Sequence, residues 1–259
     1  MAEDRKLTLW NGQIKPTVRI AGRGEPVVFL HSAFGPMWDH FLAALARNHT
    51  VYAPSHPGTG PDDVDGIRAL EDLWDLVLYY YELFDALGLK SPAVVGHSFG
   101  GMIAAELAAS DPARVGKLAL IDAYGLWRDD TPVPLASALA PKVLAKCIFH
   151  DPGDPATKLT FPDHHDHDAV IRVTWSINCA NKFIWPLPDK GLKKRIHRIS
   201  APTLIIWGRH DGLMPPVYAE EFHGKIAGSQ VAIVDDASHM CPLERPDTVA
   251  ALVTDFFKS

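Results

Sequence analysis

Short apolar runs recur along most of the chain, and each is bounded by turn residues or polar residues. The run Val27-Val28-Phe29-Leu30 is the clearest of them. Continuous apolar runs of this length are typical of strands that are buried on both faces of a parallel sheet. The pattern predicts eight strands, at residues 6–10, 17–21, 26–31, 50–54, 93–95, 115–121, 203–207 and 230–234.

The segments between these strands carry apolar residues at the spacing of a helix. Trp38, Phe41 and Leu45, for example, follow one another after three or four residues. Strands that alternate with helices predict an α/β fold, with a mostly parallel eight-stranded sheet and helices on both of its faces. The first two strands are expected to form a hairpin around Asn11-Gly12. Helices are predicted at residues 37–47, 67–87, 101–109, 217–226 and 247–257.

The region from residue 124 to residue 195 has a different texture. It contains many prolines and several aromatic residues, and no part of it predicts a strand. Helices are expected there at residues 135–148 and 169–181. We interpret this region as a helical cap, inserted into a core domain that consists of residues 1–123 and 196–259. The cap is expected to cover the functional site of the core domain.

Composition narrows the function by exclusion. The formal net charge of −6 gives no general electrostatic basis for binding nucleic acid or an anionic membrane, and no apolar run approaches the length of a membrane span. The first residues lack the layout of a signal peptide. The three cysteines are widely spaced, which is typical of free thiols in a reducing compartment. The expected location is cytoplasmic, and the expected partner is a small molecule bound by a monomer or a homodimer.

One stretch carries candidate chemistry directly. Gly96-His97-Ser98-Phe99-Gly100 follows an apolar run and precedes a helix of small residues. This G-x-S-x-G pattern is typical of a nucleophile elbow, in which a strained turn between strand and helix exposes the serine hydroxyl. The N-terminal N–H groups of the following helix favour negative charge at the same place. An ordinary glycine-rich turn between strand and helix is the alternative.

Four other polar residues follow predicted strands, as Ser98 does. They are His31, Asp122, Asp211 and His239. Ligands of α/β sheets bind at the carboxyl ends of the strands, so these positions predict one shared site. A serine nucleophile needs a base within hydrogen-bonding reach and an acid that orients that base. The chain order Ser98, Asp211, His239 is the one expected for such a triad in this kind of fold.

With these motifs the chain resembles serine hydrolases of the α/β-hydrolase-fold superfamily, in the branch of the esterases and enol-lactone hydrolases. The resemblance covers about the whole chain. It implies that Ser98 is the nucleophile, His239 the general base and later the acid, and Asp211 the carboxylate that orients His239. It implies no cofactor. Besides the hairpin, the His31 turn, the elbow and the cap, it rests on Ser55-His56-Pro57-Gly58-Thr59-Gly60, Gly208-Arg209-His210-Asp211 and Ser238-His239-Met240-Cys241-Pro242-Leu243-Glu244-Arg245-Pro246.

The resemblance also implies an oxyanion hole, made by the backbone N–H groups of Ala33 and Phe99. The superfamily usually has His-Gly at the turn where this chain has His31-Ser32, although relatives of the enol-lactone hydrolase type carry serine there too. The substrate pocket is expected to involve His31, Phe34, His97, Trp127, Trp175, Trp185 and Met240.

Two alternatives concern single sites. Some members of the superfamily place the triad acid where Asp122 stands, but the turn Gly208-Arg209-His210-Asp211 favours Asp211. The stretch Asp163-His164-His165-Asp166-His167-Asp168 contains side chains that can bind a metal. These side chains are consecutive, whereas a metal site needs ligands on one face. A solvated loop or a helix N-terminus is expected there, and no metal site.

The sequence predicts a hydrolase that cleaves a carboxylic ester or a lactone with a small, fairly apolar acyl group. A carbon–carbon bond hydrolase of ring-cleavage ketones is the alternative within the superfamily. Those relatives often have Trp after the histidine, where this chain has Met240, and they use a cap arginine, for which Arg172 and Arg128 are the candidates. A non-catalytic small-molecule receptor of the same fold is the alternative from another class.

Overall fold

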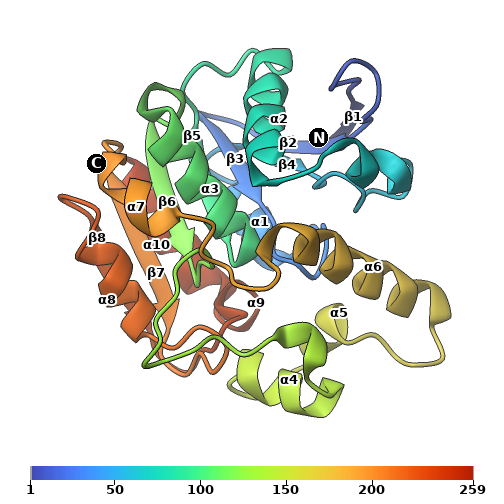
Figure 1. Ribbon diagram of the computed structural model, residues 1–259, viewed down its shortest axis with the longest axis vertical. Coiled ribbons are helices and arrows are strands. Elements are labelled where there is room, and N and C mark those ends of the chain that lie inside the picture. The colour runs from blue at the N-terminus through green and yellow to red at the C-terminus, as the bar shows by residue number, and fades with distance from the viewer. Residues whose placement is uncertain (1, 259) are drawn as a thin grey trace.

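One mixed sheet forms the centre of the molecule (Figure 1). The computed structural model describes residues 2–258. The eight strands lie in the order β1-β2-β4-β3-β5-β6-β7-β8, in which β2 is antiparallel to both neighbours and the other adjacent pairs are parallel. This order confirms the mostly parallel eight-stranded sheet that the sequence predicts. The strands are β1 (Glu3–Lys6), β2 (Thr17–Gly22), β3 (Pro26–Leu30), β4 (Thr50–Pro54), β5 (Ala93–His97), β6 (Lys117–Ile121), β7 (Thr203–Gly208) and β8 (Gln230–Val234).

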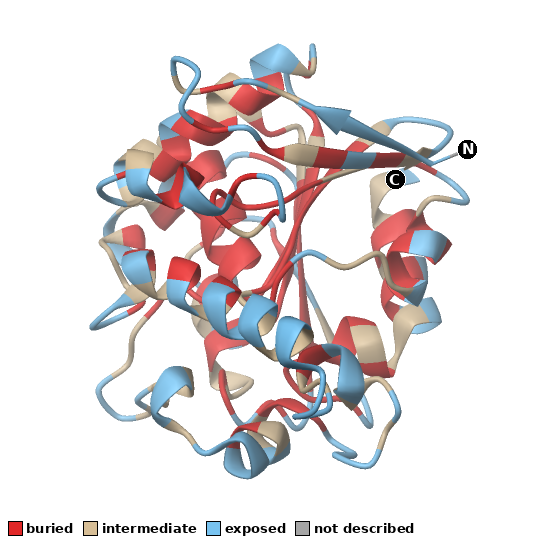
Figure 2. Cartoon of the chain, turned by 90° about the vertical axis from the view of Figure 1, so that its right-hand side faces the viewer, coloured by how far each residue is buried: buried red, intermediate tan, exposed pale blue. Residues whose placement is uncertain are grey.

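Helices cover both faces of this sheet. Figure 2 shows the buried strands between helices whose outward sides are exposed. One face is covered by α2 (Leu73–Ala86), α3 (Phe99–Ser110) and α8 (Val217–His223). The other face is covered by α1 (His40–Leu45) and α10 (Pro246–Lys258), with α9 (Cys241–Glu244) beside them.

Alternate side chains of β3 face opposite layers. Val28 and Leu30 belong to the core that includes residues of α2 and α3, whereas Val27 and Phe29 belong to the core that includes residues of α1 and α10. Successive strand residues point to opposite faces, so a run without polar residues is buried on both sides. This burial explains why the continuous apolar run lies in the middle of the sheet.

The segment between β6 and β7 contains helices and, in the part of the chain that the structure describes, no strand. α4, α5 and α6 lie together on one side of the molecule (Figure 1). The division into a core and a cap stays a prediction. The helices of this segment are η3 (Ala136–Ala138), α4 (Pro141–Ile148), α5 (Thr157–Thr160), α6 (His167–Ile184), α7 (Leu192–Arg195) and η4 (Ile196–Arg198), and the short helices elsewhere are η1 (Val64–Ala69) and η2 (Pro112–Arg114).

Two expectations from composition can be compared with the structure. No helix within residues 2–258 is long and apolar enough to cross a membrane. The three cysteines, Cys147, Cys179 and Cys241, are all free thiols, as the sequence predicts.

The opening hairpin differs from its prediction. The strand expected at residues 6–10 is reduced to a bridge between Leu9 and Ile14, and β1 lies earlier in the chain. Trp10 turns away with a φ of 52°, and its backbone N–H donates to the Glu82 carboxylate at 2.9 Å. This contact with α2, together with the packing of the indole against the core, outweighs the local β preference.

The helix predicted at residues 67–87 is divided in two. η1 comes first, and α2 begins after the N-cap residue Asp72. The Asp72 carboxylate accepts hydrogen bonds from the N–H groups of Trp74 and Asp75. These N–H groups lie before the first intrahelical hydrogen bonds, so an aspartate that pairs with them begins a new helix inside the amphipathic pattern.

Two further helices begin later than predicted. α4 starts at Pro141, because proline lacks an N–H group and is tolerated only in the first turn of a helix. α1 starts at His40, after Asp39, whose carboxylate accepts from the N–H of Leu42 at 2.8 Å. In both helices a capping or first-turn residue within the predicted range marks the true start.

Candidate active site

Ser98 lies in a strained turn between β5 and α3. Its φ of 57° and ψ of −117° belong to a region that residues other than glycine rarely adopt. A Cβ atom on Gly96 would lie 2.3 Å from the carbonyl oxygen of Gly100, and one on Gly100 would lie 2.0 Å from that of Leu30. The turn therefore requires glycine on both sides of the serine, as the sequence pattern indicates.

Ser98, His239 and Asp211 form an unbroken chain of hydrogen bonds. Nε2 of His239 lies 2.8 Å from Oγ of Ser98, and Nδ1 of His239 lies 2.8 Å from Oδ2 of Asp211. The side chains of His239 and Asp211 are fully buried. Oδ1 of Asp211 accepts from the N–H groups of Leu213 and Met214, both at 2.8 Å. Three N–H groups therefore hold this carboxylate in place.

The position of the Asp211 carboxylate decides which ring nitrogen of His239 carries a hydrogen. A carboxylate can only accept, so Nδ1 donates to it, and Nε2 is left to accept from the Ser98 hydroxyl. This is the tautomer in which a histidine can take a proton from serine. Tyr124 closes one side of the histidine, since its ring stands edge-on to His239 with the centroids 5.8 Å apart.

Two backbone N–H groups near Ser98 have no acceptor among residues 2–258. Phe99 is the first residue of α3, so its N–H precedes the first intrahelical hydrogen bond. The N–H of Ala33, in the turn after β3, also donates to no protein group. Ala33 and Phe99 line the same small cavity. They are the two residues for which the resemblance implies an oxyanion hole, and their N–H groups are free to bind an oxyanion.

Residues 27–252 match the model of the alpha/beta hydrolase family. The chain belongs to this family. A monoacylglycerol lipase of Xenopus laevis is 29% identical over 275 residues, which cover 92% of this chain and 78% of that protein. A 2-hydroxy-6-oxo-6-phenylhexa-2,4-dienoate hydrolase of Burkholderia cepacia is 26% identical over 264 residues, or 91% of this chain and 88% of that protein.

A solved structure supports the same fold. The esterase of Exiguobacterium antarcticum matches 99% of this chain with 100% of its own, at a TM-score of 0.81 and 22% identity. The resemblance to alpha/beta hydrolases is therefore confirmed, and the chain is an enzyme of this family.

In this alpha/beta hydrolase, the side chain of His97 contacts the backbone of His239. Nε2 of His97 donates to the backbone carbonyl oxygen of His239 at 2.8 Å. Burial and then the neighbouring His239 lower the pKa of His97 to about 3. The ring is therefore neutral and donates a hydrogen bond to the loop that carries His239. His97 thus has a structural role in the site.

The turn after β3 rests on a pair of stacked histidines. The ring centroids of His31 and His56 are 3.7 Å apart. His56 donates its backbone N–H to Nε2 of His31 at 3.1 Å and its Nε2–H to the carbonyl oxygen of His31 at 2.8 Å, while its Nδ1 accepts from the Tyr80 hydroxyl. Nδ1 of His31 then donates to the carbonyl oxygen of Ser32 at 2.6 Å.

This pair stays uncharged. Burial lowers the pKa of His31 well below its ordinary value, and burial lowers the pKa of His56 to about 4. The sequence pattern places His56 in a loop and gives Tyr80 no role in the site. No spacing signal connects Tyr80 to the site, because the middle of α2 reaches the turn only through tertiary packing.

Asp122, the alternative acid, lies close to the triad without contacting His239. Its Oδ1 accepts from the N–H of Gly208 at 2.8 Å, so it holds the start of the turn that carries Asp211. Burial raises the pKa of the Asp122 carboxyl well above its ordinary value, and the neighbouring Asp211 raises it further. These surroundings favour the protonated form of the Asp122 carboxyl, and Asp211 is the carboxylate that pairs with His239.

A small cavity lies between the turn after β3, which contains Ala33, and α6. Its volume is about 10 Å³, which is room for about one water molecule. The hydroxyl of Ser176 lies in its wall, is 2% exposed and has no hydrogen-bond partner in the described part of the chain. The indole of Trp175 donates to the carbonyl oxygen of Gly58 at 2.8 Å. α6 therefore closes over this side of the site.

The other residues predicted for the pocket have different surroundings. Phe34 is buried against Phe161, with the ring centroids 6.2 Å apart. The indole of Trp127 donates to Asp129, and Trp185 is 59% exposed beyond the end of α6. Neither of these two tryptophans borders the cavities next to the turn. A second small cavity beside the turn is bordered by His31, His97 and Met240.

Proposed function

We propose that this alpha/beta hydrolase cleaves a carboxylic ester or a lactone through a covalent acyl-enzyme. Ser98 is the nucleophile, His239 is the general base and then the acid, and Asp211 orients His239. The observation that carries this proposal is the pair of 2.8 Å hydrogen bonds from Asp211 through His239 to the strained Ser98. A serine without such a base is a poor nucleophile at neutral pH.

The reaction begins when Oγ of Ser98 attacks the acyl carbonyl carbon while its proton passes to Nε2 of His239. The carbonyl oxygen becomes negatively charged and is bound by the N–H groups of Phe99 and Ala33, each of which contributes about 3 kcal/mol in comparable sites. His239 then gives its proton to the leaving oxygen as the acyl bond breaks. Water attacks the acyl-enzyme by the same route in reverse, with His239 again as base.

The acyl group is proposed to be short and apolar. The cavity beside Phe99 is lined by Leu76, Cys179 and Phe183, none of which offers a charge. Its volume is about 10 Å³, so even a short acyl group has to displace side chains of α6. Displacement grows more costly with each added methylene group in a packed interior. We therefore expect the rate to fall with acyl chain length.

Cleavage of carbon–carbon bonds is the second candidate, supported by the similarity to the Burkholderia cepacia hydrolase. The arginines considered for this chemistry lie elsewhere. Arg172 is exposed on α6, and Arg128 is paired with Asp130 and Glu221. Neither arginine lines the small cavities beside the turn after β3, so neither is placed to bind a dienoate carboxylate there. This favours the ester or lactone reaction over the carbon–carbon reaction.

The test is release of p-nitrophenol from acetate, butyrate and octanoate esters by the native protein, by Ser98→Ala and by Ser110→Ala. Ser110 ends the same helix and serves as the matched control. We expect turnover beyond one equivalent that is lost only in Ser98→Ala. Cleavage of a ring-cleavage dienone without ester turnover would favour the second candidate. A folded protein that turns over neither substrate would overturn both candidate reactions.

A further inference from the structure

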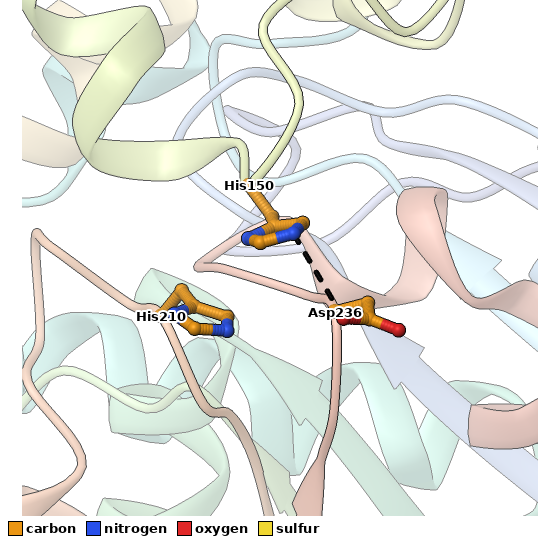
Figure 3. A group of neighbouring side chains, drawn as sticks. All are labelled: His150, His210 and Asp236. Carbon is orange, nitrogen blue, oxygen red and sulfur yellow. Dashed lines mark ion pairs between the residues drawn. The ribbon is translucent and has the colours of Figure 1, made fainter.

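Three side chains from distant parts of the chain meet on the surface near the candidate active site (Figure 3). His150 follows α4, His210 lies in the turn after β7, and Asp236 lies in the loop after β8. One ligating atom from each lies within 4.8 Å of the other two, and all three residues are exposed. The two imidazole rings stack with centroids 4.4 Å apart, and Nε2 of His150 lies 3.9 Å from Oδ1 of Asp236.

Buried hydrogen bonds hold the three backbones together. The Glu244 carboxylate accepts from the N–H of His150 at 2.7 Å through one oxygen and from the N–H of Ser238 at 2.8 Å through the other. The Ser238 hydroxyl lies 2.9 Å from the carbonyl oxygen of His210, whose own N–H donates to Ala237. Glu244 and Ser238 are themselves buried. Buried side chains therefore fix the backbone beneath the exposed cluster.

The ligating atoms are free for another partner. The ring nitrogens of His210 make no hydrogen bond within residues 2–258. Oδ2 of Asp236 lies 3.9 Å from Arg245, which is too far for a hydrogen bond. Asp236 has a φ of 49°, a conformation that aspartate and asparagine tolerate better than most residues. Within residues 2–258 these three side chains contact one another and Arg245, and no hydrogen bond occupies their ligating atoms.

We propose that His150, His210 and Asp236 bind a divalent transition-metal ion of the zinc type, with water completing the coordination. Two imidazoles and one carboxylate are a donor set that suits zinc, whereas magnesium and calcium prefer oxygen ligands. Tetrahedral zinc at about 2.0 Å from each donor needs donors about 3.3 Å apart. The two stacked rings have to turn so that a nitrogen of each faces the metal, and both side chains are exposed. The proposal departs from the expectation of no metal site.

Residues 163–168 are the metal candidate that the sequence offers, and they differ from this cluster in how their backbone is held. Asp163, His164 and His165 also lie within ligating distance of one another, but they are consecutive and exposed. The Asp163 carboxylate accepts from the N–H of His165 at 2.9 Å as part of a local turn. Asp166 caps α6, as expected for a helix N-terminus. Within residues 2–258 no buried side chain fixes the backbone of this stretch as Glu244 and Ser238 do for the other cluster, so it serves as the control.

The experiment is calorimetric titration of zinc chloride into the full-length protein after treatment with a chelator. The variants are His150→Ala, His210→Ala and Asp236→Asn, in which asparagine tolerates the backbone conformation. The control is His164→Ala/His165→Ala. We expect one zinc site in the native protein and in the control, and at least about tenfold weaker binding in each of the three variants. Zinc should also raise the Tm of the native protein more than that of the variants.

Three results would overturn the proposal. They are zinc binding that persists unchanged in all three variants, zinc binding that is lost in the His164→Ala/His165→Ala control, and magnesium binding as tight as zinc binding. Circular dichroism melts without metal show whether each variant is folded. Asp236→Asn replaces a side chain at a fully accessible position, so it keeps the test decisive if a histidine variant is unstable.

Discussion

Replacing Asp211 with asparagine changes one group of the triad and reverses its hydrogen bonding. The asparagine oxygen stays with the N–H groups of Leu213 and Met214, so the new NH₂ group faces Nδ1 of His239. The opposite orientation would place NH₂ against two N–H donors and lose two hydrogen bonds, at a cost of about 2 kcal/mol or more. Nδ1 then has to accept, the ring hydrogen moves to Nε2, and His239 can no longer take the Ser98 proton.

The expected loss in kcat is on the order of 10⁴-fold, or about 5 kcal/mol of transition-state stabilisation. The loss should fall on kcat rather than on KM, because the substrate does not touch Asp211. Geometry should be retained, since both backbone hydrogen bonds to the side chain persist. The variant should therefore unfold at nearly the same denaturant concentration as the native protein.

Asp122→Asn is the matched control. Asp122 is also buried, but its surroundings raise its pKa and favour the protonated form, which asparagine resembles closely. The amide oxygen can still accept from the N–H of Gly208. We expect kcat to stay within about threefold of the native value.

The assay is steady-state hydrolysis of p-nitrophenyl acetate by the two variants and the native protein, together with urea unfolding of each. The reasoning fails if Asp211→Asn keeps more than about a tenth of the activity. It also fails if Asp122→Asn loses as much as Asp211→Asn, because Asp122 would then be the orienting acid.

Two further predictions follow from buried polar groups. The pKa of His97 is lowered to about 3, so between pH 6.5 and 3 the unfolded chain binds a proton that the native protein does not, and stability falls as the pH falls. From pH 7 to pH 4, the free energy of unfolding measured in urea should therefore fall by roughly 3 kcal/mol less in His97→Gln than in the native protein. Equal decreases in the two proteins would contradict the lowered pKa of His97. The buried Ser176 hydroxyl has no hydrogen-bond partner within residues 2–258, so Ser176→Ala should unfold at the same or a higher urea concentration. KM for esters should rise, because the hydroxyl lies in the wall of the cavity proposed for the acyl group. A clear loss of stability in Ser176→Ala would show that the hydroxyl has a partner within the fold.

Much of the site could be predicted because its residues follow strands. Parallel strands end at one edge of the sheet, so residues in the turns after β5, β7 and β8 lie at the same edge whatever the helices between them do. Ser98, Asp211 and His239 all lie there, and the structure brings them into hydrogen-bonding contact. The glycines beside Ser98 are required by backbone contacts within a few residues, which is why a short motif is informative.

The pocket could not be predicted in the same way. Residue type alone pointed to Trp175, Trp127 and Trp185. Of these three, only Trp175 donates to the loop that faces the turn after β3. The helices between β6 and β7 have no sheet to set their register. Their inward faces are therefore decided by side-chain packing between segments that are distant in sequence.

The sequence by itself determined the sheet, the elbow and the order of the triad, since each depends on local periodicity or on the shared edge of parallel strands. Only the tertiary structure decided the rest. It supplied the support of His31 by His56 and Tyr80, the raised pKa of Asp122, and the meeting of His150, His210 and Asp236. Each of these depends on burial or on contacts between segments far apart along the chain, and no local pattern records such contacts.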